Sequence, residues 1–524
     1  MTTDYSDRVE DIRLKEYPHM NSGIYLDHGG TTIYARSLVD AFAMKMTTSL
    51  YGNPHSANKP AQLSGDMVDD IREKTLRFLG ADPRHFDLVF VANATAAIKL
   101  VGECFRDLAE KTRTRTFWYG YHKDAHTSLV GLRELTNGDS YCFESDTEVQ
   151  SWLDRPDMAT ANVRRVQPSG LGLFAYPGQS NLSGRRLPLS WVKHLRDSMS
   201  LQNTYSLLDA AALAVTRSMT DVFRDVDAAP DFTCLSFYKI FGFPDLGGLV
   251  VRKDSGHILT LRKYFGGGTV LMVSALAGVW HKSKSPTSVL SPLGLETDSH
   301  LEGYNIHDSL EDGTLPFHSI IALGEALFVH SRLYGSMESI SRHTTRLGKR
   351  LFQEMKSLRH GNGRPVCYIY SEDESAFGDA NRQGATLAFN IMRQAGTFVP
   401  YSDVERMANE KNIYIRSGGV CNPGGLYTAL RYEPWELARA LSAGLACGSD
   451  RLNLIHHLPT GIVRVSLGAM STEADINAFI SFLQDSFAEG RDRSTPLYIE
   501  TKGDQLREPR LDGAVGMVAA LSFA

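Results

Sequence analysis

The sequence has little cysteine and no large excess of charge of either sign. Its six cysteines, at positions 104, 142, 234, 367, 421 and 447, lie far apart and form no CxxC pair. This spacing argues against a zinc site and against a disulfide framework, and it predicts reduced thiols. We therefore expect no metal site. A formal net charge of -5 gives no sign of a nucleic-acid partner.

Long apolar runs are also missing. No stretch approaches the roughly 20 apolar residues that a membrane-spanning helix needs. The opening "MTTDYSDRVEDIRLKEYP" is acidic and polar, which fits neither a secretory signal nor a transit peptide. We therefore expect no membrane partner and a cytoplasmic location. With 42% hydrophobic and 22% charged residues, the 524-residue chain has a globular composition and room for two or three domains.

Between residues 60 and 330 the sequence alternates strand-like and helical patterns. Short β-rich runs occur as "FDLVFVA", "TFWYGY", "GLFAYP", "YSLLDA", "FTCLSF" and "GGLVVR". Helical segments such as "ATAAIKLVGECFRDLAE" lie between several of them. Near-continuous apolar strands that alternate with helices indicate a mainly parallel sheet covered on both faces. The predicted fold class is α/β, with a large domain over residues 60–330.

The pattern changes after residue 330. A long helical stretch with a possible break at Gly335 precedes the strand-like runs "GATLAFNIM", "NIYIRSG" and "IVRVSLG". We predict a smaller α+β domain over residues 331–490 and a tail over residues 491–524. Residues 1–59 are expected to form an N-terminal segment that belongs to the small domain and the substrate entrance.

Polar side chains follow four of the predicted strands, where ligands of parallel sheets bind. In chain order they are Thr95, which follows Ala94 at a helix start, Asn181, Asp209, and the group Ser236, Tyr238 and Lys239. Each has an ordinary explanation taken singly, as a cap, an Asx-turn or a surface lysine. Together, a phosphate cradle, an amide, a carboxylate and a lysine predict a pyridoxal 5′-phosphate site. The lysine would bind the cofactor covalently, the carboxylate would keep the pyridinium nitrogen protonated, and the amide would donate to the ring hydroxyl.

A resemblance to a known family rests on the order Thr95, His126, Asn181, Asp209 and Ser236-x-x-Lys239. This order resembles the class V aminotransferase superfamily of fold-type I pyridoxal-phosphate transferases, which contains the cysteine desulfurases. Those enzymes have a large domain with a mainly parallel seven-stranded sheet. The resemblance implies that His126 stacks on the cofactor ring and assists proton transfer. It also implies, through "EDGTLPF", that Thr314 reaches the phosphate of a neighbouring subunit in a homodimer.

Within the superfamily, the segments "YLDHGGTTIYA", "SFYKIFGFPDLGGLVVR", "IRSGGVCNPGG" and "PTGIVRVSLGAMST" resemble the amino-terminal, NifS-like domain of the molybdenum cofactor sulfurases. The resemblance covers roughly residues 20 to 490. It implies that L-cysteine is the substrate and alanine the product. Sulfur would form a persulfide on Cys421 and pass to the molybdenum cofactor or to a protein that binds it. The glycines on both sides of Cys421 predict a hinged loop that can carry this sulfur.

Arg464, in "GIVRVSLG", lies on a predicted strand where a guanidinium needs a partner. The resemblance implies that it binds the substrate α-carboxylate, and an internal salt bridge is the alternative. His28, Asn53 and His55 occur in segments near the substrate entrance of the family, and no firm role follows for them.

Two departures from the family pattern leave alternatives open. Ala212 stands where many desulfurases have Gln or His, three residues after the aspartate. Molybdenum cofactor sulfurases also continue into a MOSC domain, so we expect a desulfurase that is either truncated or works with a separate acceptor. The alternatives are a different C–S or C–C lyase or epimerase of the superfamily, a desulfurase with another sulfur acceptor, and a non-catalytic scaffold. Cys421 favours sulfur transfer, because a plain lyase needs no thiol.

Overall fold

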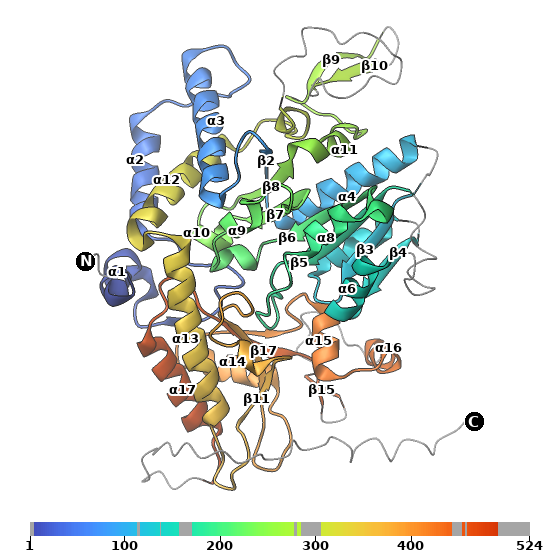
Figure 1. Cartoon of the computed structure of the whole chain (residues 1–524). Helices are drawn as coiled ribbons and strands as arrows, with labels where there is room; N and C mark the ends of the chain where they lie inside the picture. The colour runs from blue at the N-terminus through green and yellow to red at the C-terminus, as the bar shows by residue number, and fades with distance from the viewer. Residues whose placement is uncertain are drawn as a thin grey trace.

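Figure 1 presents the chain as a computed structural model. The structure describes residues 5–112, 116–136, 138–156, 170–276, 280–284, 305–442, 453–455 and 458–490. The predicted tail and Cys447 lie outside these residues. Within the described ranges, no helix combines the length and apolar character that crossing a membrane requires.

A seven-stranded sheet forms the centre of the molecule, in the order β2-β8-β7-β6-β5-β3-β4. Within this sheet, β8 runs antiparallel to both of its neighbours, and the pairs from β7 to β4 are parallel. The predicted α/β fold with a mainly parallel sheet of seven strands is confirmed. Its strands are β2 (Phe86–Val91), β3 (Trp118–His122), β4 (Ser140–Phe143), β5 (Gly172–Pro177), β6 (Thr204–Asp209), β7 (Phe232–Ser236) and β8 (Gly247–Arg252).

Helices cover both faces of this sheet (Figure 1). Side chains alternate between the two faces of a strand, so in β6 Leu207 joins one apolar core and Leu208 the other. The core around Leu207 contains residues of α4 and α11, and the core around Leu208 contains residues of the other helices named in the next sentence. These helices are α4 (Ala94–Lys111) and α11 (His257–Thr260) on one face, and α2 (Arg36–Thr48), α3 (Lys59–Leu79), α6 (Asp146–Asp154), α8 (Trp191–Asp197), α9 (Thr220–Phe223), α10 (Tyr238–Phe241) and α12 (Phe317–Tyr334) on the other.

A glycine with positive φ follows the end of each of two long helices. α3 ends at Leu79 and Gly80 follows with φ +78°, as the sequence predicts. The predicted break at Gly335 is also present, because α12 ends at Tyr334 and Gly335 has φ +75°. The chain restarts as α13 (Met337–Ser357), where the Ser336 hydroxyl accepts a hydrogen bond from the Ser339 amide.

A second, four-stranded sheet lies below the first in Figure 1 and has the antiparallel order β11-β12-β17-β14. Its core contains side chains from α13, α14 and α17. The elements are β11 (Cys367–Tyr370), β12 (Thr386–Ile391), α14 (Tyr401–Asn409), β14 (Arg416–Gly418), α15 (Pro423–Leu430), α16 (Pro434–Ser442), β17 (Ile462–Ser466) and α17 (Glu473–Phe487). Small two-stranded sheets pair β9 (Val270–Ser274) with β10 (Trp280–Ser283), and β15 (Leu454–Ile455) with β16 (Leu458–Pro459).

The N-terminal segment contacts both layers. β1 (Ile24–Tyr25) pairs in parallel with β13 (Ile413–Tyr414), and Arg13 of α1 (Val9–Glu16) forms an ion pair with Asp475 of α17. α2 packs instead on α12 beside the large sheet. The segment therefore contacts elements of both layers, and an isolated bridge to Ser466 places Asp27 beside β17.

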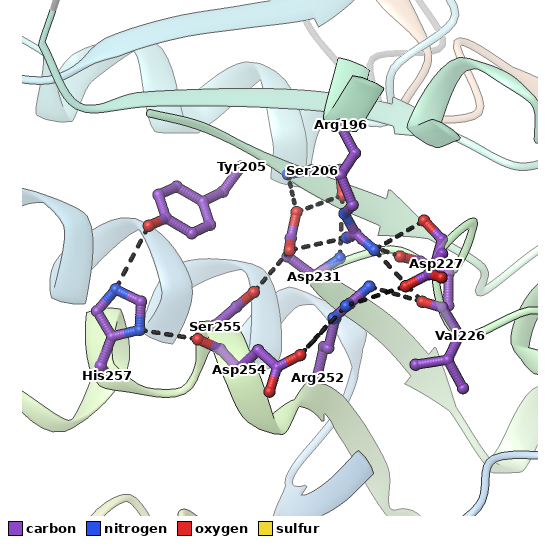
Figure 2. A network of polar contacts seen from close by, with 11 residues as sticks. Arg196, Tyr205, Ser206, Val226, Asp227, Asp231, Arg252, Asp254, Ser255 and His257 are labelled. Carbon is purple, nitrogen blue, oxygen red and sulfur yellow. Dashed lines mark hydrogen bonds and ion pairs between the residues drawn. The ribbon is translucent and has the colours of Figure 1, made fainter. Parts of the chain in front are cut away.

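A buried ionic network holds the amino ends of β6 and β7 (Figure 2). The Asp231 carboxylate accepts hydrogen bonds from Arg196 Nη2 at 3.0 Å and from Ser255 Oγ at 2.6 Å. Its second oxygen accepts from the Ser206 amide at 2.8 Å and from the Ser206 hydroxyl at 2.7 Å. A buried carboxylate is tolerated when its oxygens are satisfied in this way. This end of the sheet is opposite to the edge where the predicted site residues lie.

Candidate functional site

The start of α4 lies against the end of β7. The backbone amide of Ala94 donates to the buried Ser236 hydroxyl at 3.0 Å. Asn93 caps the helix, since its side chain accepts from the Ala96 amide at 3.0 Å. Gly247 lets this turn approach β8, because an added Cβ there would come within 2.5 Å of the Asn93 Cα. The helix start and Ser236 together can bind an anionic group such as a phosphate.

Hydroxyl groups extend this anion cradle. Thr95 is exposed, and its Oγ1 lies 2.7 Å from the Oγ of Ser128. Ser128 belongs to α5 (Thr127–Val130), which follows β3. Sequence reasoning missed Ser128. The signal that could have found it is its position two residues after His126, at the start of a helix that follows a strand.

Asp209 and Lys239 lie at the carboxyl ends of adjacent parallel strands. Asp209 ends β6, is 7% exposed, and accepts a hydrogen bond from the Ala211 amide at 3.0 Å. Lys239 lies in α10, three residues after β7 ends. Burial lowers the pKa of the Lys239 amine; Asp209 opposes this shift, and the cations Arg464 and Arg416 reinforce it. A lysine with a lowered pKa is more readily the neutral amine that attacks a carbonyl.

His126 is held as a neutral imidazole next to these groups. It caps α5: its Nδ1 accepts from the Ser128 amide at 3.1 Å and lies 2.9 Å from the Ser128 hydroxyl. Burial lowers the pKa of His126, with Asp209 opposing and Lys239 reinforcing the shift. Because Nδ1 accepts, the proton of the neutral ring is on Nε2. The free N–H can therefore donate to, or exchange a proton with, a bound group.

Asn181 connects three parts of the chain. Its Nδ2 donates to the carbonyl of Val420 at 2.7 Å, and its Oδ1 accepts from Asn422 Nδ2 at 3.0 Å. Its backbone carbonyl accepts from Arg464 Nη1 at 3.0 Å. A carboxamide nitrogen carries two protons, so one remains for a ligand. Ala212 lines a small cavity with Asn181 and brings no polar group to it.

Arg464 is 2% exposed and forms an ion pair with Asp27, whose Oδ1 lies 2.6 Å from Arg464 Nη2. The internal salt bridge, which was the alternative to substrate binding as the role of Arg464, is therefore present. Burial lowers the pKa of Arg464, and Asp27 opposes the shift. Its Nε is buried without a hydrogen-bond partner among the described residues. Arg416 is the register partner of Arg464 on the neighbouring strand, so two cations lie side by side here. Sequence reasoning missed the contribution of Asp27.

The Cys421 side chain is exposed, yet its main chain is fixed. The Cys421 carbonyl accepts from the amide of Thr127 at 2.9 Å, directly beside His126. Both Val420 and Cys421 have left-handed backbone angles, with φ of +43° and +56°. The glycines predicted a hinged loop, and this stays a prediction. In the structure, the carbonyls of Val420 and Cys421 accept hydrogen bonds from Asn181 after β5 and from Thr127 after β3, contacts that glycine spacing does not reveal.

Thr314 forms its hydrogen bond with a different segment, the loop before α3. It is exposed, and its hydroxyl accepts from Asn53 Nδ2 at 3.3 Å. His55 Nε2 lies 3.0 Å from the carbonyl of Gly313 in the same turn. The contacts of Asn53 and His55 place the "GNPHS" and "EDGTLPF" segments together.

Tyr238, which was predicted to contact the cofactor, is half-buried. Its carbonyl accepts a hydrogen bond from the Thr32 amide at 3.4 Å.

His28 is a buried structural neighbour of the site. It is 1% exposed, and its Nδ1 lies 2.9 Å from the Thr32 hydroxyl. Burial lowers the pKa of His28 to about 3, so the ring is neutral at physiological pH. An added Cβ at Gly468 would lie 2.4 Å from its ring, which shows how tightly this ring is enclosed.

The residues present fit pyridoxal phosphate. The α4 start with Ser236 and Thr95 suits its phosphate, Asp209 suits its pyridinium nitrogen, and Lys239 suits its aldehyde. In the part of the chain that the structure describes, the Lys239 amine makes no hydrogen bond or ion pair, so it is available to a ligand. Across the same residues, no cluster of three or more His, Cys, Asp or Glu side chains could hold a metal ion.

The fold resembles solved cysteine desulfurases. A desulfurase from Thermococcus onnurineus NA1 superposes with a TM-score of 0.63 at 18% identity, covering 91% of this chain and 97% of that one. The desulfurase CsdA from Escherichia coli gives 0.62 at 18% identity, covering 91% and 98%. These structures share the fold-type I architecture of pyridoxal-phosphate transferases.

The sequence matches the family model of aminotransferase class-V over residues 24–479. The chain belongs to this family, whose cofactor is pyridoxal phosphate. It is 50% identical over 485 residues to a protein of Aspergillus niger named molybdenum cofactor sulfurase. It is 51% identical over 488 residues to a protein of the same name from Aspergillus oryzae. Both matches cover 93% of this chain and 55% of the relative, so the chain spans about half the length of these relatives.

Proposed function

We propose that the chain is a pyridoxal-phosphate-dependent L-cysteine desulfurase that forms a persulfide on Cys421 and transfers its sulfur. One observation carries this proposal: the Cys421 carbonyl is bonded to the Thr127 amide, beside His126, at the sheet edge that holds Asp209 and Lys239. This contact supports placing the exposed Cys421 thiol at the same site as the lysine that we propose as the covalent anchor of the cofactor. An ordinary lyase of this fold has no use for that thiol.

The residues divide the work as follows. Lys239 anchors the cofactor, Asp209 binds its ring nitrogen, and Asn181 donates to its ring hydroxyl. Ala94, Thr95 and Ser236 would bind its phosphate, and Tyr238, which lies between Ser236 and Lys239 in the sequence, would be a further cofactor contact. When bound, pyridoxal phosphate supplies an electron sink next to the substrate α-carbon. Arg464 binds the substrate carboxylate.

Sulfur transfer then takes place between two thiols. The Cys421 thiolate attacks the sulfur of the bound cysteine. The S–S bond forms as the Cβ–S bond breaks, and the electron pair of that bond stays with Cβ. Cβ takes up a proton, for which the Nε2–H of His126 is the candidate donor. Alanine leaves, and the protein keeps a persulfide. No outside oxidant or reductant is needed for this step.

The proposed sulfur acceptor is the molybdenum cofactor or a protein that binds it. The name shared by the fungal relatives supports this acceptor. A desulfurase that serves another acceptor is the second candidate. We also propose that the large domain spans residues 60–330 and the small domain spans residues 331–490. The proposed location of the protein is the cytoplasm.

A homodimer with a composite site is the proposed assembly. Thr314 is exposed and is not bonded to Lys239 or Ser236 in its own chain, which supports a role in a neighbouring site. The nearby β9–β10 hairpin carries exposed apolar side chains, Met272, Val273 and Leu276 among them, as a subunit interface would. The hairpin adjoins the Thr314 turn through a backbone bridge between Gly267 and Gly313.

Subunit mixing tests the composite site. Lys239→Ala and Thr314→Ala chains are refolded together and alanine formation is measured. If Thr314 acts in the neighbouring subunit, a mixed dimer contains one intact site and regains activity that neither variant has alone. Absence of rescue in a mixed dimer of verified composition would mean that Thr314 does not act across subunits.

The proposed function is tested by mass spectrometry after incubation with L-cysteine. We expect one added sulfur on the peptide that contains Cys421, together with stoichiometric alanine. Cys421→Ala should keep the absorbance of bound cofactor and lose both products, whereas Cys142→Ala, a thiol outside the site, should behave as the wild type. Undiminished sulfide release by Cys421→Ala, with pyruvate as the co-product, would instead identify a C–S lyase.

A further inference from the structure

The main chain on both sides of Cys421 is tied to the large sheet by two asparagine side chains. We propose that Asn422 and Asn181 form a clasp, and that Asn422 is a positioning residue that fixes the Cys421 thiol for sulfur transfer. The clasp is defined by four hydrogen bonds of the two carboxamides: one each with Asp124, Val420 and Gly425, and one between the two carboxamides.

Asn422 is the buried half of the clasp. It is 0% exposed, although it directly follows an exposed cysteine. Its Nδ2 donates to the carbonyl of Asp124 and to Asn181 Oδ1, each at 3.0 Å. Its Oδ1 accepts from the Gly425 amide at 3.0 Å, which caps α15. All hydrogen-bonding positions that point into the protein are therefore used, and only a carboxamide of this length fills them.

Asn181 is the second half, and it acts on the other side of the cysteine. Its Nδ2 donates to the carbonyl of Val420, the residue before Cys421, at 2.7 Å. Asn181 is also the residue that the proposed function assigns to the cofactor ring hydroxyl. One carboxamide therefore touches the cysteine loop and faces the cofactor site, which links the thiol position to the bound cofactor.

Close backbone approach completes the docking. The Cys421 carbonyl accepts from the Thr127 amide at 2.9 Å. An added Cβ at Gly424 would lie 2.2 Å from the carbonyl of Lys123, so glycine is needed where α15 begins against the β3 loop. The glycines after the cysteine thus permit contact with the large sheet, in addition to any flexibility they give.

The backbone at the cysteine needs such support. Val420 and Cys421 both have positive φ, at +43° and +56°, and a β-branched residue rarely adopts this conformation. Two consecutive left-handed residues persist when their surroundings determine them. The carbonyl of each is bonded, one to Asn181 and the other to Thr127. The clasp therefore selects a loop conformation that the isolated sequence disfavours.

The consequence for catalysis rests on the proposed function. The proposed function assigns Asn422 no contact with substrate or cofactor, although its Nδ2 donates to Asn181. Its loss should therefore leave the cofactor bound and the KM for L-cysteine nearly unchanged. The kcat for alanine formation should fall by roughly 10- to 100-fold, because a misplaced nucleophile loses its attack geometry. This split between kcat and KM separates a positioning role from a substrate-binding role.

Two variants isolate the clasp. Asn422→Ser keeps a hydroxyl that can cap α15 but removes the amide donors to Asp124 and Asn181. Asn422→Ala removes both functions. Ser336→Ala is the matched control, because it removes an equivalent side-chain cap from α13, another helix that packs on the four-stranded sheet. We expect Asn422→Ser and Asn422→Ala to show the same fall in kcat, with cofactor absorbance kept, and Ser336→Ala to match the wild type.

Amide hydrogen exchange provides a readout that does not depend on activity. In the wild type, the Thr127 amide and the 416–426 peptide should be protected, and Asn422→Ser should speed exchange in both segments. Ser336→Ala should change exchange only near α13. Fast exchange of both segments in the wild type would overturn the clasp without any variant, so a poorly folding mutant does not block the test.

The outcomes separate this proposal from the proposed function. If Asn422→Ser has the kcat and the amide-exchange protection of the wild type, Asn422 acts only as a helix cap, and the clasp proposal is wrong. A wild-type protein that makes neither alanine nor persulfide would overturn the proposed function, and the exchange measurement would still decide whether the clasp exists.

Discussion

The guanidinium of Arg464 is joined to the carboxylate of Asp27, with 2.6 Å between Nη2 and Oδ1. Arg464 comes from the centre of the small sheet, and Asp27 comes from the loop after β1. A guanidinium has five N–H donors, so the contacts to Asp27 and Asn181 leave the Nε edge unused. The salt bridge therefore orients Arg464 and, among the described residues, leaves the edge that carries Nε without a hydrogen-bond partner.

Replacing Arg464 tests whether that edge binds substrate. Arg464→Lys keeps the charge but loses the planar pair of donors. We expect the KM for L-cysteine to rise by about 10- to 100-fold, which corresponds to one charged hydrogen bond of about 1.5–3 kcal/mol, with the cofactor absorbance retained. Arg84→Ala, at an exposed arginine on the far surface, is the control. An unchanged KM would leave Arg464 with a structural role through Asp27 alone.

The lowered pKa of Lys239 predicts the pH dependence of cofactor uptake. Covalent attachment needs the neutral amine, so the uptake rate of cofactor-free protein should rise to a plateau with a midpoint below the value of about 10.4 for free lysine. Arg416 contributes to the lowering. Arg416→Gln should therefore move the midpoint upward, as measured by stopped-flow absorbance. A midpoint at the free-lysine value in the wild type would contradict the electrostatic account.

The same shift has a defined sign for stability. Between the lowered pKa of Lys239 in the folded state and its ordinary value in the unfolded state, the unfolded chain binds more protons. The contribution of Lys239 to the free energy of unfolding of cofactor-free protein therefore increases with pH across that window. Lys239→Ala should remove this slope from denaturant titrations carried out at successive pH values.

The local sequence was sufficient to locate a site residue where that residue follows a strand with a clear apolar pattern. Asp209 and Ser236 end apolar strands, and Lys239 follows shortly after, so strand prediction also located them. The strands β4 and β11 were missed because they lie at sheet edges and are largely half-buried, which weakens their apolar pattern. The long helices and their glycine ends have clear local signals and were predicted.

Contacts between distant segments could not be predicted in this way. Asp27 meets Arg464, and Asn181 meets Asn422, across hundreds of residues. Nothing in the local pattern around Asp27 or Asn422 specifies these partners, because they depend on how the two sheets are placed. The loop around Cys421 is the clearest case, since its glycines suggest mobility while Asn181 and Thr127 hold its carbonyls.

The Thr314 turn predicts a structural effect on cofactor binding. Glu311, three residues before Thr314, forms a double ion pair with buried Arg72, at 2.6 and 2.9 Å, and accepts from the Phe90 amide at 2.7 Å. Glu311→Gln leaves the Arg72 charge unpaired, so we expect a loss of about 3–5 kcal/mol in the free energy of unfolding. Weaker pyridoxal-phosphate binding should accompany it, because the turn moves.

A double replacement separates these two effects. The double variant Glu311→Gln with Arg72→Met removes both charges. It should regain part of the free energy of unfolding, measured by urea titration, while its affinity for the cofactor stays low. Recovery of cofactor affinity together with stability would mean that the turn geometry does not depend on this ion pair.

The Asp231 network in Figure 2 should affect stability without affecting the site. Asp231→Ala leaves Arg196 without its carboxylate partner and removes four hydrogen bonds to that carboxylate. We expect a loss of about 3–5 kcal/mol in the free energy of unfolding. The site lies at the other end of β6 and β7, so the cofactor absorbance and the KM of the folded fraction should not change. Asp227→Ala is the matched control: its carboxylate is 80% exposed and pairs with Arg252 at 3.7 Å, and an exposed pair contributes at most about 1 kcal/mol. Equal destabilisation by the two variants would show that the buried network contributes no more than a surface charge.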